Sequence, residues 1–164
     1  MKQEFNYCNC CGSPMEVRDV HGNPRPVCTS CGWVVYLDPK VVVGMLLDLN
    51  GGLVMVKRAT NPGKGLWSFP AGFVDRGEIA EDAAARETWE ETGLVSQAKS
   101  LAGVYSRTGD PLVLIVYDGE VTGGEMKVGG PEVEEVGSFP QHELPPLAFD
   151  RDAPIIEAWF NRRG

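Results

Sequence analysis

The sequence has no long apolar run and little positive charge. No stretch approaches the roughly 20 apolar residues that a membrane-spanning helix needs, and the opening MKQEFNYCNC lacks the apolar segment of a secretory signal. Lysine and arginine together number 15 against 23 aspartates and glutamates, so the formal net charge is −8. Sequence-independent binding to nucleic acid or to an anionic membrane requires clustered basic residues. We therefore expect a cytoplasmic protein that does not bind membranes, and nucleic acid is not the expected partner.

The chain also lacks internal repeats, low-complexity tracts and a flexible linker. Its 164 residues suffice for one packed domain with a small appendage. A hydrophobic content of 43% and a charged content of 23% are ordinary for a globular protein. The junction at 38–40, Asp-Pro-Lys, is too short to act as a flexible spacer. We predict two domains, 1–37 and 38–164.

Cysteine is absent after residue 31, and all five cysteines lie within the first 31 residues. They include two Cys-x-x-Cys-Gly segments with 16 residues between the inner cysteines. Two such pairs at that separation match a tetrahedral zinc site with four thiolate ligands. A disulfide framework is disfavoured by the odd number of cysteines and by the expected compartment. The pattern predicts a Zn²⁺ site in a zinc ribbon, with the ligands Cys8, Cys11, Cys28 and Cys31.

Cys10 is the fifth cysteine, and it could in principle take the place of Cys8. Cys8 keeps the two-residue spacing and is therefore preferred. Four protein ligands leave no open coordination position, which favours a structural role over catalysis. His21 begins an expected turn at 21–24 and is interpreted as a turn residue, because four thiolates already complete the site.

The apolar pattern of the larger domain predicts strands and two helices. The expected strands are 41–47, 53–58, 67–72, 101–107, 112–117 and 133–139, with a loop-rich span at 123–131. One helix is expected at 79–92 and ends at Gly93, whose position suits a left-handed cap. A second is expected from Asp150 to about residue 163, with Asp150 or Asp152 as its cap. This order predicts an α+β fold, an α-β-α sandwich whose mixed sheet is flanked by helices.

Residues 72–94 form an acidic segment, GFVDRGEIAEDAAARETWEETGL. Glu87, Glu90 and Glu91 are spaced i, i+3 and i+4, so a helix places their carboxylates on one face. Like charges at this spacing repel, and a divalent cation with hard oxygen ligands would offset the repulsion. The alternative is an exposed acidic helix with solvated glutamates. That alternative explains neither the glycine-rich loop before the helix nor the Arg-Glu pair at 86–87.

The pattern Gly-x5-Glu-x7-Arg-Glu-φ-x-Glu-Glu-x-Gly-φ, where φ is an apolar residue, resembles the signature of the Nudix hydrolases. The departure is Thr88, where the family usually has an aliphatic residue. The resemblance implies the Nudix fold and hydrolysis of a nucleoside diphosphate linked to another group, dependent on Mg²⁺ or Mn²⁺. It also implies a homodimer. The matching residues are Gly72, Glu78, Arg86, Glu87, Glu90, Glu91, Gly93 and Leu94.

The resemblance further implies roles for individual residues. The metal ligands would be the backbone carbonyl of Ala71 and the carboxylates of Glu87, Glu90 and Glu91. Behind these ligands, Glu78 and Arg86 would pair with each other or with the ligand carboxylates and fix the loop against the helix.

One more catalytic carboxylate is expected from outside this segment, as a metal ligand or general base. Glu135 fits that position best and Glu132 second, and an exposed loop acid is the alternative for each.

Substrate contacts are expected from an arginine and an aromatic residue. Arg58 ends the second predicted strand and could bind phosphate through its planar guanidinium. A solvated charge at the strand end is an equal alternative for Arg58. Among the aromatic residues that could stack on a base or flavin ring, Trp67 is preferred because it adjoins the loop that leads to the site. The others are Tyr36, Phe69, Phe73 and Tyr105.

A zinc ribbon fused to a Nudix domain is similar to two groups of enzymes. One group is the NADH pyrophosphatases, which also remove NAD caps from RNA and carry a Ser-Gln-Pro-Trp-Pro-Phe-Pro-x-Ser element. Residues 101–107 contain nothing like that element. The other group is the FAD and ADP-ribose pyrophosphatases, which the chain resembles at 65–67, 70–72, 86–91 and 147–149.

The expected function is therefore cleavage of ADP-ribose or FAD between its phosphates, which yields AMP and the partner phosphate. A pyrophosphatase for NADH or NAD-capped RNA is the alternative enzyme. A nucleic-acid-binding or ligand-sensing module is a third hypothesis. It is disfavoured because residues 8–31 hold Arg18 and Arg25 as their only lysine or arginine residues.

Overall fold

The computed structural model describes residues 5–163, and they form two compact units divided between Pro39 and Lys40. Within the described residues, no helix is long and apolar enough to span a membrane.

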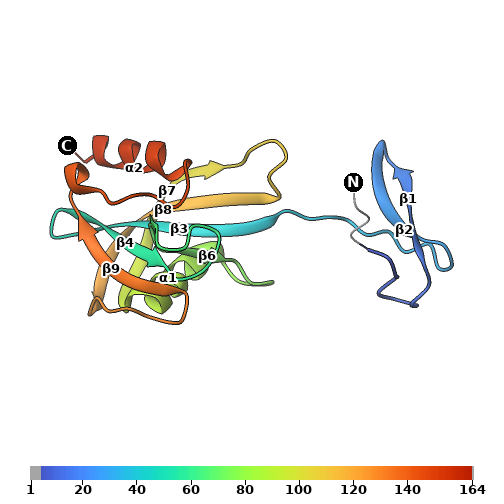
Figure 1. Ribbon diagram of the computed structural model, residues 1–164, viewed down its shortest axis with the longest axis horizontal. Helices are drawn as coiled ribbons and strands as arrows, with labels where there is room; N and C mark the ends of the chain where they lie inside the picture. The colour runs from blue at the N-terminus through green and yellow to red at the C-terminus, as the bar shows by residue number, and fades with distance from the viewer. Residues whose placement is uncertain (1–4, 164) are drawn as a thin grey trace. The chain divides into compact units, whose positions relative to one another are not determined.

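The first unit is built on a two-stranded antiparallel ribbon, β1 (Met15–Val20) and β2 (Asn23–Cys28) (Figure 1). His21 and Gly22 connect the strands, and both have positive φ, 55° and 78°. Two consecutive left-handed residues make the tight turn that matches the twist of an antiparallel hairpin. The expectation that His21 is a turn residue is confirmed, although the turn is shorter than the predicted 21–24 because residue 23 already belongs to β2.

The second unit contains seven strands, two α-helices and a short 3-10 helix. In chain order these are β3 (Lys40–Leu49), β4 (Gly52–Arg58), β5 (Trp67–Ser68), β6 (Ala71–Phe73), α1 (Ala80–Thr92), β7 (Leu94–Tyr105), β8 (Leu112–Gly124), β9 (Val133–Phe139), η1 (Gln141–Glu143) and α2 (Asp152–Asn161).

The strands form a mixed sheet in the order β5-β4-β3-β8-β7, with β6 paired to β3 and β9 paired to β4. The pairing of β3 with β8 is parallel, and the other pairings are antiparallel. β3 is the apolar run of the sequence, and its side chains alternate between two buried clusters. A central strand covered on both faces explains why that run is continuous rather than alternating.

One edge of β3 is shared by two partners. Near its end, Asp48 pairs with Leu53 of β4, whereas nearer its start Val43 pairs with Gly72 of β6. The single strand expected at 67–72 is therefore two short strands with different partners. Pro70 lies between them and cannot donate to a ladder, which explains the break. The arrangement delivers the segment from residue 71 onward beside the centre of the sheet.

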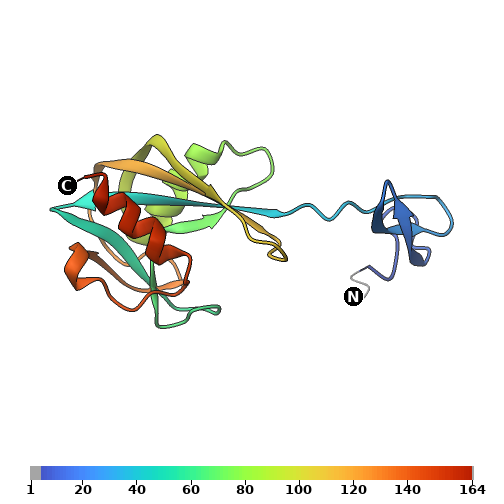
Figure 2. The same cartoon turned by 90° about the horizontal axis from the view of Figure 1, so that it is seen from above.

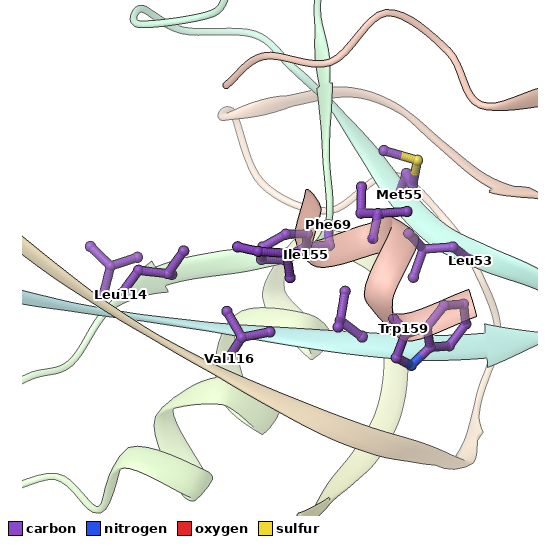
Figure 3. Close-up of a cluster of buried hydrophobic side chains, with 10 residues drawn as sticks. Leu53, Met55, Phe69, Leu114, Val116, Ile155 and Trp159 are labelled. Atoms are coloured by element: carbon purple, nitrogen blue, oxygen red, sulfur yellow. The ribbon is translucent and has the colours of Figure 1, made fainter. Parts of the chain in front are cut away.

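The two helices cover opposite faces of the sheet (Figures 1 and 2). Figure 3 shows the cluster under α2, where Ile155 and Trp159 meet Phe69 and side chains of β4 and β8. The second cluster lies under α1 and includes Ala83 and Ala84 of that helix. The predicted mixed sheet flanked by helices is confirmed.

Several boundaries differ from the prediction. β7 begins at Leu94, directly after the helix, and not at residue 101, while β8 continues through Gly124 into the span predicted as loop. β7 holds buried residues at only a few positions and has three register irregularities, so its apolar pattern is weak. Helix α1 ends at Gly93 with φ of 72°, which confirms the predicted left-handed cap.

Helix α2 begins at Asp152, two residues later than predicted, and the cap prediction was wrong. Its N-cap residue is Arg151, and no side chain caps the helix. Asp152 is instead buried and accepts a hydrogen bond of 3.0 Å from the Ser68 hydroxyl. Its carboxylate therefore joins α2 to β5.

Candidate functional site

Four cysteines gather at one end of the ribbon. The Sγ atoms of Cys11 and Cys28 are 3.5 Å apart, as are those of Cys11 and Cys31, and the Cys8 and Cys31 sulfurs are 3.7 Å apart. The cysteines are not joined by disulfides, and all four sulfurs lie within 4.8 Å of one another. Among residues 5–163 this is the only group of three or more potential ligand side chains gathered so closely. These four thiols could hold one metal ion.

Backbone amides point at these sulfurs. Cys10 N donates to Cys8 Sγ at 3.3 Å, and Ser30 N and Cys31 N both donate to Cys28 Sγ at 3.4 Å. Hydrogen bonds from Ser13, first among them its backbone bond, lower the pKa of Cys11 to about 6. Amide donors stabilise the thiolate, which is the form that binds metal. The side chain of Cys10 is exposed and lies outside the cluster.

The acidic segment begins as strand β6 and a tight loop before α1. Glu78 accepts a hydrogen bond of 3.0 Å from the Asp75 amide, and Gly77 has φ of 88°. A side chain at this φ would be strained, so glycine suits the turn. Glu78 thus closes the loop on itself while its carboxylate faces the helix.

Arg86 joins the loop to the helix. Its Nε and Nη2 donate to the two oxygens of Glu78 at 2.7 and 2.9 Å, and Nη2 also donates to the Phe73 carbonyl at 3.0 Å. Its Nη1 reaches Glu87 at 2.7 Å and Glu90 at 3.3 Å. The guanidinium, followed by the Asp75 amide, lowers the pKa of Glu78 to about 2. A planar guanidinium with five donors can hold this arrangement, which a lysine cannot.

Glu87 packs against the backbone of β6. A Cβ atom at Gly72 would clash with the Glu87 carboxylate, so this glycine makes room for it. Burial raises the pKa of Glu87, although Arg86 opposes the shift. The side chain is 16% exposed.

Glu91 lies closest to the expected backbone ligand. Its Oε2 accepts a hydrogen bond of 3.0 Å from the Ala71 amide. Burial, together with the charge of Glu87, raises the pKa of Glu91 to about 8, although the hydrogen bond from the Ala71 amide opposes the shift. In the acidic segment 72–94, called the box below, Glu87 and Glu91 thus lie against β6, and Arg86 joins Glu78, Glu87 and Glu90. Among residues 5–163 the three glutamate carboxylates are not gathered as closely as the four cysteines.

The donor set fits a divalent cation. Glu87 and Glu91 are two carboxylates with raised pKa values, close enough that each is affected by neighbouring acids. Anions in such surroundings are unfavourable without a compensating charge. Carboxylate and carbonyl oxygens are the ligands that Mg²⁺ prefers. A cation bound here would remove the repulsion between these groups.

Of the two acids expected from outside the box, only Glu132 has a charge that acts on the box glutamates. The charge of Glu132 is among the influences that raise the pKa of both Glu87 and Glu91. Glu135 pairs in register with Lys57 of β4, and its Oε1 lies 2.6 Å from the Lys57 ammonium. Its carboxylate is thus neutralised by a lysine.

Arg58 is held on both sides. Its Nε donates to the Pro62 carbonyl at 2.7 Å, and its guanidinium carbon lies 5.4 Å from the centre of the Phe149 ring. Its charge also lowers the pKa of Glu91. Arg58 is thus anchored at the end of β4, and its contact with phosphate stays a prediction.

The expected stacking residues are differently placed. Trp67 is half-buried and packs edge-to-face on Phe139, with ring centres 4.9 Å apart. Phe69 is buried in the core, whereas Phe73 is exposed beside Lys40. Tyr105 lines a cavity next to α2. Tyr36 belongs to the first unit, where the Arg25 guanidinium lies over its ring.

Sequence reasoning missed two features near the box. The guanidinium groups of Arg58 and Arg151 both lie over the Phe149 ring. The amides of Lys127 and Gly129 donate to the last carbonyls of α1. Aromatic residues and glycines in loops give no signal of such contacts in a single sequence.

Comparison with known proteins gives two family matches. The family model described as NUDIX domain matches residues 38–160. A zinc-ribbon family model, described as Nudix N-terminal, matches residues 6–37. Together they account for nearly the whole chain.

Individual relatives agree with these matches. The ADP-ribose pyrophosphatase of Methanocaldococcus jannaschii is 42% identical over 133 residues, which are 77% of this chain and 78% of that protein. The NAD-capped RNA hydrolase NudC of Pseudomonas entomophila is 28% identical over 165 residues, which cover 98% of this chain. The chain spans 58% of the length of that NudC.

Among solved structures, a NUDIX hydrolase from Nitrosomonas europaea has a TM-score of 0.91 and 29% identity, and the match covers 97% of this chain and 92% of that one. The family matches agree with the structure. The NUDIX match covers the domain with the α-β-α fold and the box around Arg86, and the zinc-ribbon match covers the four-cysteine cluster. The chain belongs to the Nudix family and is a Nudix hydrolase with an N-terminal zinc-ribbon segment.

Proposed function

We propose that this enzyme is a pyrophosphohydrolase that cleaves the diphosphate of ADP-ribose or FAD, using Mg²⁺ or Mn²⁺. The products would be AMP and the phosphorylated partner. The observation that carries the proposal is the gathering of Glu87 and Glu91 around Gly72 and Ala71, with Glu90 held to the same guanidinium of Arg86. The 42% identity to an ADP-ribose pyrophosphatase supports the choice of substrate.

Within this proposal, Glu87, Glu90 and Glu91 hold the metal with the Ala71 carbonyl. A bound cation neutralises the diphosphate and lowers the pKa of an attacking water. Arg86 and Glu78 hold the loop against α1, so that the glutamates keep their positions. Among the acids outside the box, we propose Glu132 before Glu135, because its charge reaches Glu87 and Glu91.

Arg58 and Trp67 are the proposed substrate contacts. The charge of Arg58 acts on the Glu91 carboxylate, and its planar guanidinium is suited to binding a phosphate held at the box. The Trp67 backbone is held by hydrogen bonds to Pro146 and Ala148, and its ring is held by the edge-to-face contact with Phe139.

The remaining assignments concern the ribbon and the assembly. We propose the division into a zinc ribbon, 1–37, and a catalytic domain, 38–164, with Zn²⁺ bound by Cys8, Cys11, Cys28 and Cys31. The four closely gathered thiols and the match to a zinc-ribbon family support Zn²⁺, which favours a closed four-thiolate site. A homodimer is proposed from the family resemblance.

The substrate is tested by product analysis. ADP-ribose, FAD and NADH are each incubated with the enzyme and Mg²⁺ or Mn²⁺, and AMP release is measured. We expect the highest kcat/KM on ADP-ribose or FAD. If no dinucleotide released AMP with either metal, the proposed function would be wrong.

A second candidate, hydrolysis of NADH or NAD-capped RNA, is favoured by the NudC match over 98% of the chain. It is disfavoured because residues 101–107 lack the element expected of that group. In the structure these residues end strand β7 and enter the turn to β8. A kcat/KM for NADH above that for ADP-ribose would favour this second candidate.

A further inference from the structure

A cavity of about 300 Å³ lies between the β7–β8 turn and the start of α2. Tyr105 and Arg107 line it from the turn, and Arg151 and Pro154 line it from the helix. None of these residues belongs to the box.

Within the described residues, neither arginine of the cavity has a close anionic partner. Within residues 5–163, Arg107 makes no ion pair, and it is exposed at the rim. The Arg151 side chain is only 20% exposed, and its Nε is buried without a hydrogen-bond partner. Its nearest carboxylate oxygen, on Asp152, is 4.0 Å away and belongs to a group already bonded to Ser68. A buried donor without an acceptor is unfavourable, and a ligand rich in acceptors would relieve it.

Phe149 links the cavity to Arg58. The guanidinium carbons of Arg58 and Arg151 lie 5.4 and 5.1 Å from the centre of the same ring, that of Phe149. The guanidinium carbons of Arg58 and Arg151 therefore cannot be farther apart than the sum of these two distances. Because Arg58 is itself a proposed phosphate contact, a substrate bound at Arg58 would lie near the cavity.

The charge of the cavity selects for an anion. Its lining includes two guanidiniums and one carboxylate, that of Asp110. The Asp110 carboxylate accepts a hydrogen bond of 3.0 Å from the Leu112 amide, which occupies one of its oxygens in the turn. Two planar guanidiniums facing one space match the oxygens of a phosphate group.

We propose that this cavity binds a phosphate group of the substrate through Arg107 and Arg151, a role that rests on the proposed dinucleotide hydrolysis. The phosphate is either one of the two in the cleaved diphosphate or a monoester on the sugar. Either phosphate would accept the same hydrogen bonds from the two arginines. Two substrates, one with and one without the monoester, distinguish these possibilities.

The test compares ADP-ribose with its 2′-phosphorylated form in steady-state kinetics. Arg107→Gln should raise KM about 10-fold or more for any substrate that places phosphate in the cavity, with kcat little changed, because a charged hydrogen bond is lost. An increase for both substrates identifies the diphosphate as the source, and an increase confined to the 2′-phosphate form identifies the monoester. Arg151→Lys, which keeps the charge but not the planar donors, should act in the same direction.

Two further variants sharpen the result. Asp110→Asn keeps the acceptor for Leu112 but removes the negative charge, so KM should fall for the same substrate. Arg162→Gln removes an arginine that pairs with Asp118 elsewhere, and it should leave KM unchanged. If Arg107→Gln and Arg151→Lys both left KM for each substrate unchanged, the proposal would be overturned.

Direct binding separates this proposal from the proposed function. Wild-type protein and Arg107→Gln are titrated with adenosine 2′,5′-bisphosphate by calorimetry, without turnover. Weaker binding by the variant supports the cavity even if no dinucleotide is hydrolysed. Equal binding by both proteins, or no binding by the wild type, counts against it.

Discussion

At the scale of single residues, Arg86 shows how one side chain organises the box. Its guanidinium bonds Glu78 through two nitrogens and reaches two of the proposed metal ligands through the third. The side chain is 29% exposed, so these bonds are partly shielded from water. No other residue type could replace this geometry, because the bonds diverge from one rigid plane.

Replacing Arg86 by lysine should therefore loosen the loop while keeping the charge. We expect Arg86→Lys to destabilise the fold by about 1–3 kcal/mol, since charge-assisted hydrogen bonds to Glu78 are lost. The kcat should fall by a larger factor than the KM changes, because the metal ligands lose their position. Thermal unfolding and kinetics with ADP-ribose check this. Wild-type values for both would show that Arg86 does not organise the site.

Asp152 gives a pH-dependent prediction. Burial raises its pKa from 3.8 to about 6, although the Ser68 hydroxyl and the nearby arginines 151 and 58 oppose the shift. The folded state thus holds this proton more tightly than the unfolded state does. The protonated carboxyl therefore stabilises the fold by about 3 kcal/mol below about pH 4. This contribution to the free energy of unfolding is lost as the pH rises through 6.

The measurement is a pair of denaturation series. Asp152→Asn keeps an acceptor for Ser68 but cannot ionise, so its unfolding free energy relative to wild type should rise between pH 4 and pH 6. Ser68→Ala, which removes a donor to the charged form, should enlarge the pH dependence of the wild-type residue. A difference between Asp152→Asn and wild type that stayed constant with pH would contradict the account.

Some residue roles could be predicted from the sequence, and others could not. The spacing of Glu87, Glu90 and Glu91 predicts their common helix face, because that spacing is a property of the helix itself. The choice between Glu132 and Glu135 depends on strand register, in which Glu135 meets Lys57. Asp152 looks like a helix cap in the sequence, and only the packing of α2 on β5 shows it bonded to Ser68.

At the scale of elements, the loop after β8 covers the end of helix α1. Lys127 N donates to the Thr92 carbonyl at 2.8 Å, and Gly129 N donates to the Glu91 carbonyl at 3.1 Å. These carbonyls belong to the last turn, where a helix leaves acceptors unsatisfied. The same loop leads into Glu132, so the capped helix end and the outer acid are parts of one structure.

Gly129 is the residue on which this loop depends. A Cβ atom there would clash with the Glu90 carbonyl, so Gly129→Ala should push the loop away from α1. We expect a loss of about 1–3 kcal/mol in stability. The Mg²⁺ concentration for half-maximal activity should also rise, in the same direction as in Glu132→Gln. Thermal unfolding and metal titration of activity measure these effects.

Gly123→Ala is the matched control, because the nearest atom to a Cβ at Gly123 is 4.0 Å away. It should behave as wild type in the metal titration. Equal metal requirements for Gly129→Ala and Gly123→Ala would show that the loop does not position Glu132.

Elements with strong local signals were predicted well, and those defined by pairing were not. The apolar run of β3, the Ala-rich helix α1 and its glycine cap are visible in the sequence because each has its own pattern. β7 carries exposed residues at most positions and is defined by its pairing with β8. The split of 67–72 into β5 and β6 depends on which strand each piece meets, which no local pattern encodes.

At the scale of the whole molecule, the two units depend on different sources of stability. The first has a small buried cluster that includes Cys8, Met15 and Cys28. The second has two clusters on opposite faces of its sheet. A unit with so small a core needs a metal or another crosslink to stay folded.

Zinc removal should therefore unfold the ribbon and leave the catalytic domain folded. In the metal-bound protein we expect Cys10 to react rapidly with a thiol reagent, and after chelation all five cysteines should react. Circular dichroism should keep the signal of the larger unit, and Mg²⁺ added back should restore catalysis. A thiol reactivity that chelation did not alter would contradict the structural role of zinc.

The central claim is that the box glutamates hold the metal that catalyses diphosphate hydrolysis. The most direct test is AMP release from ADP-ribose in Mg²⁺ by wild type, Glu91→Gln and the control Glu157→Gln, which alters an exposed acid of α2. The account predicts that kcat/KM falls about 100-fold or more in Glu91→Gln, or about 2.7 kcal/mol of transition-state stabilisation, and stays at the wild-type value in Glu157→Gln. Undiminished turnover by Glu91→Gln would contradict it.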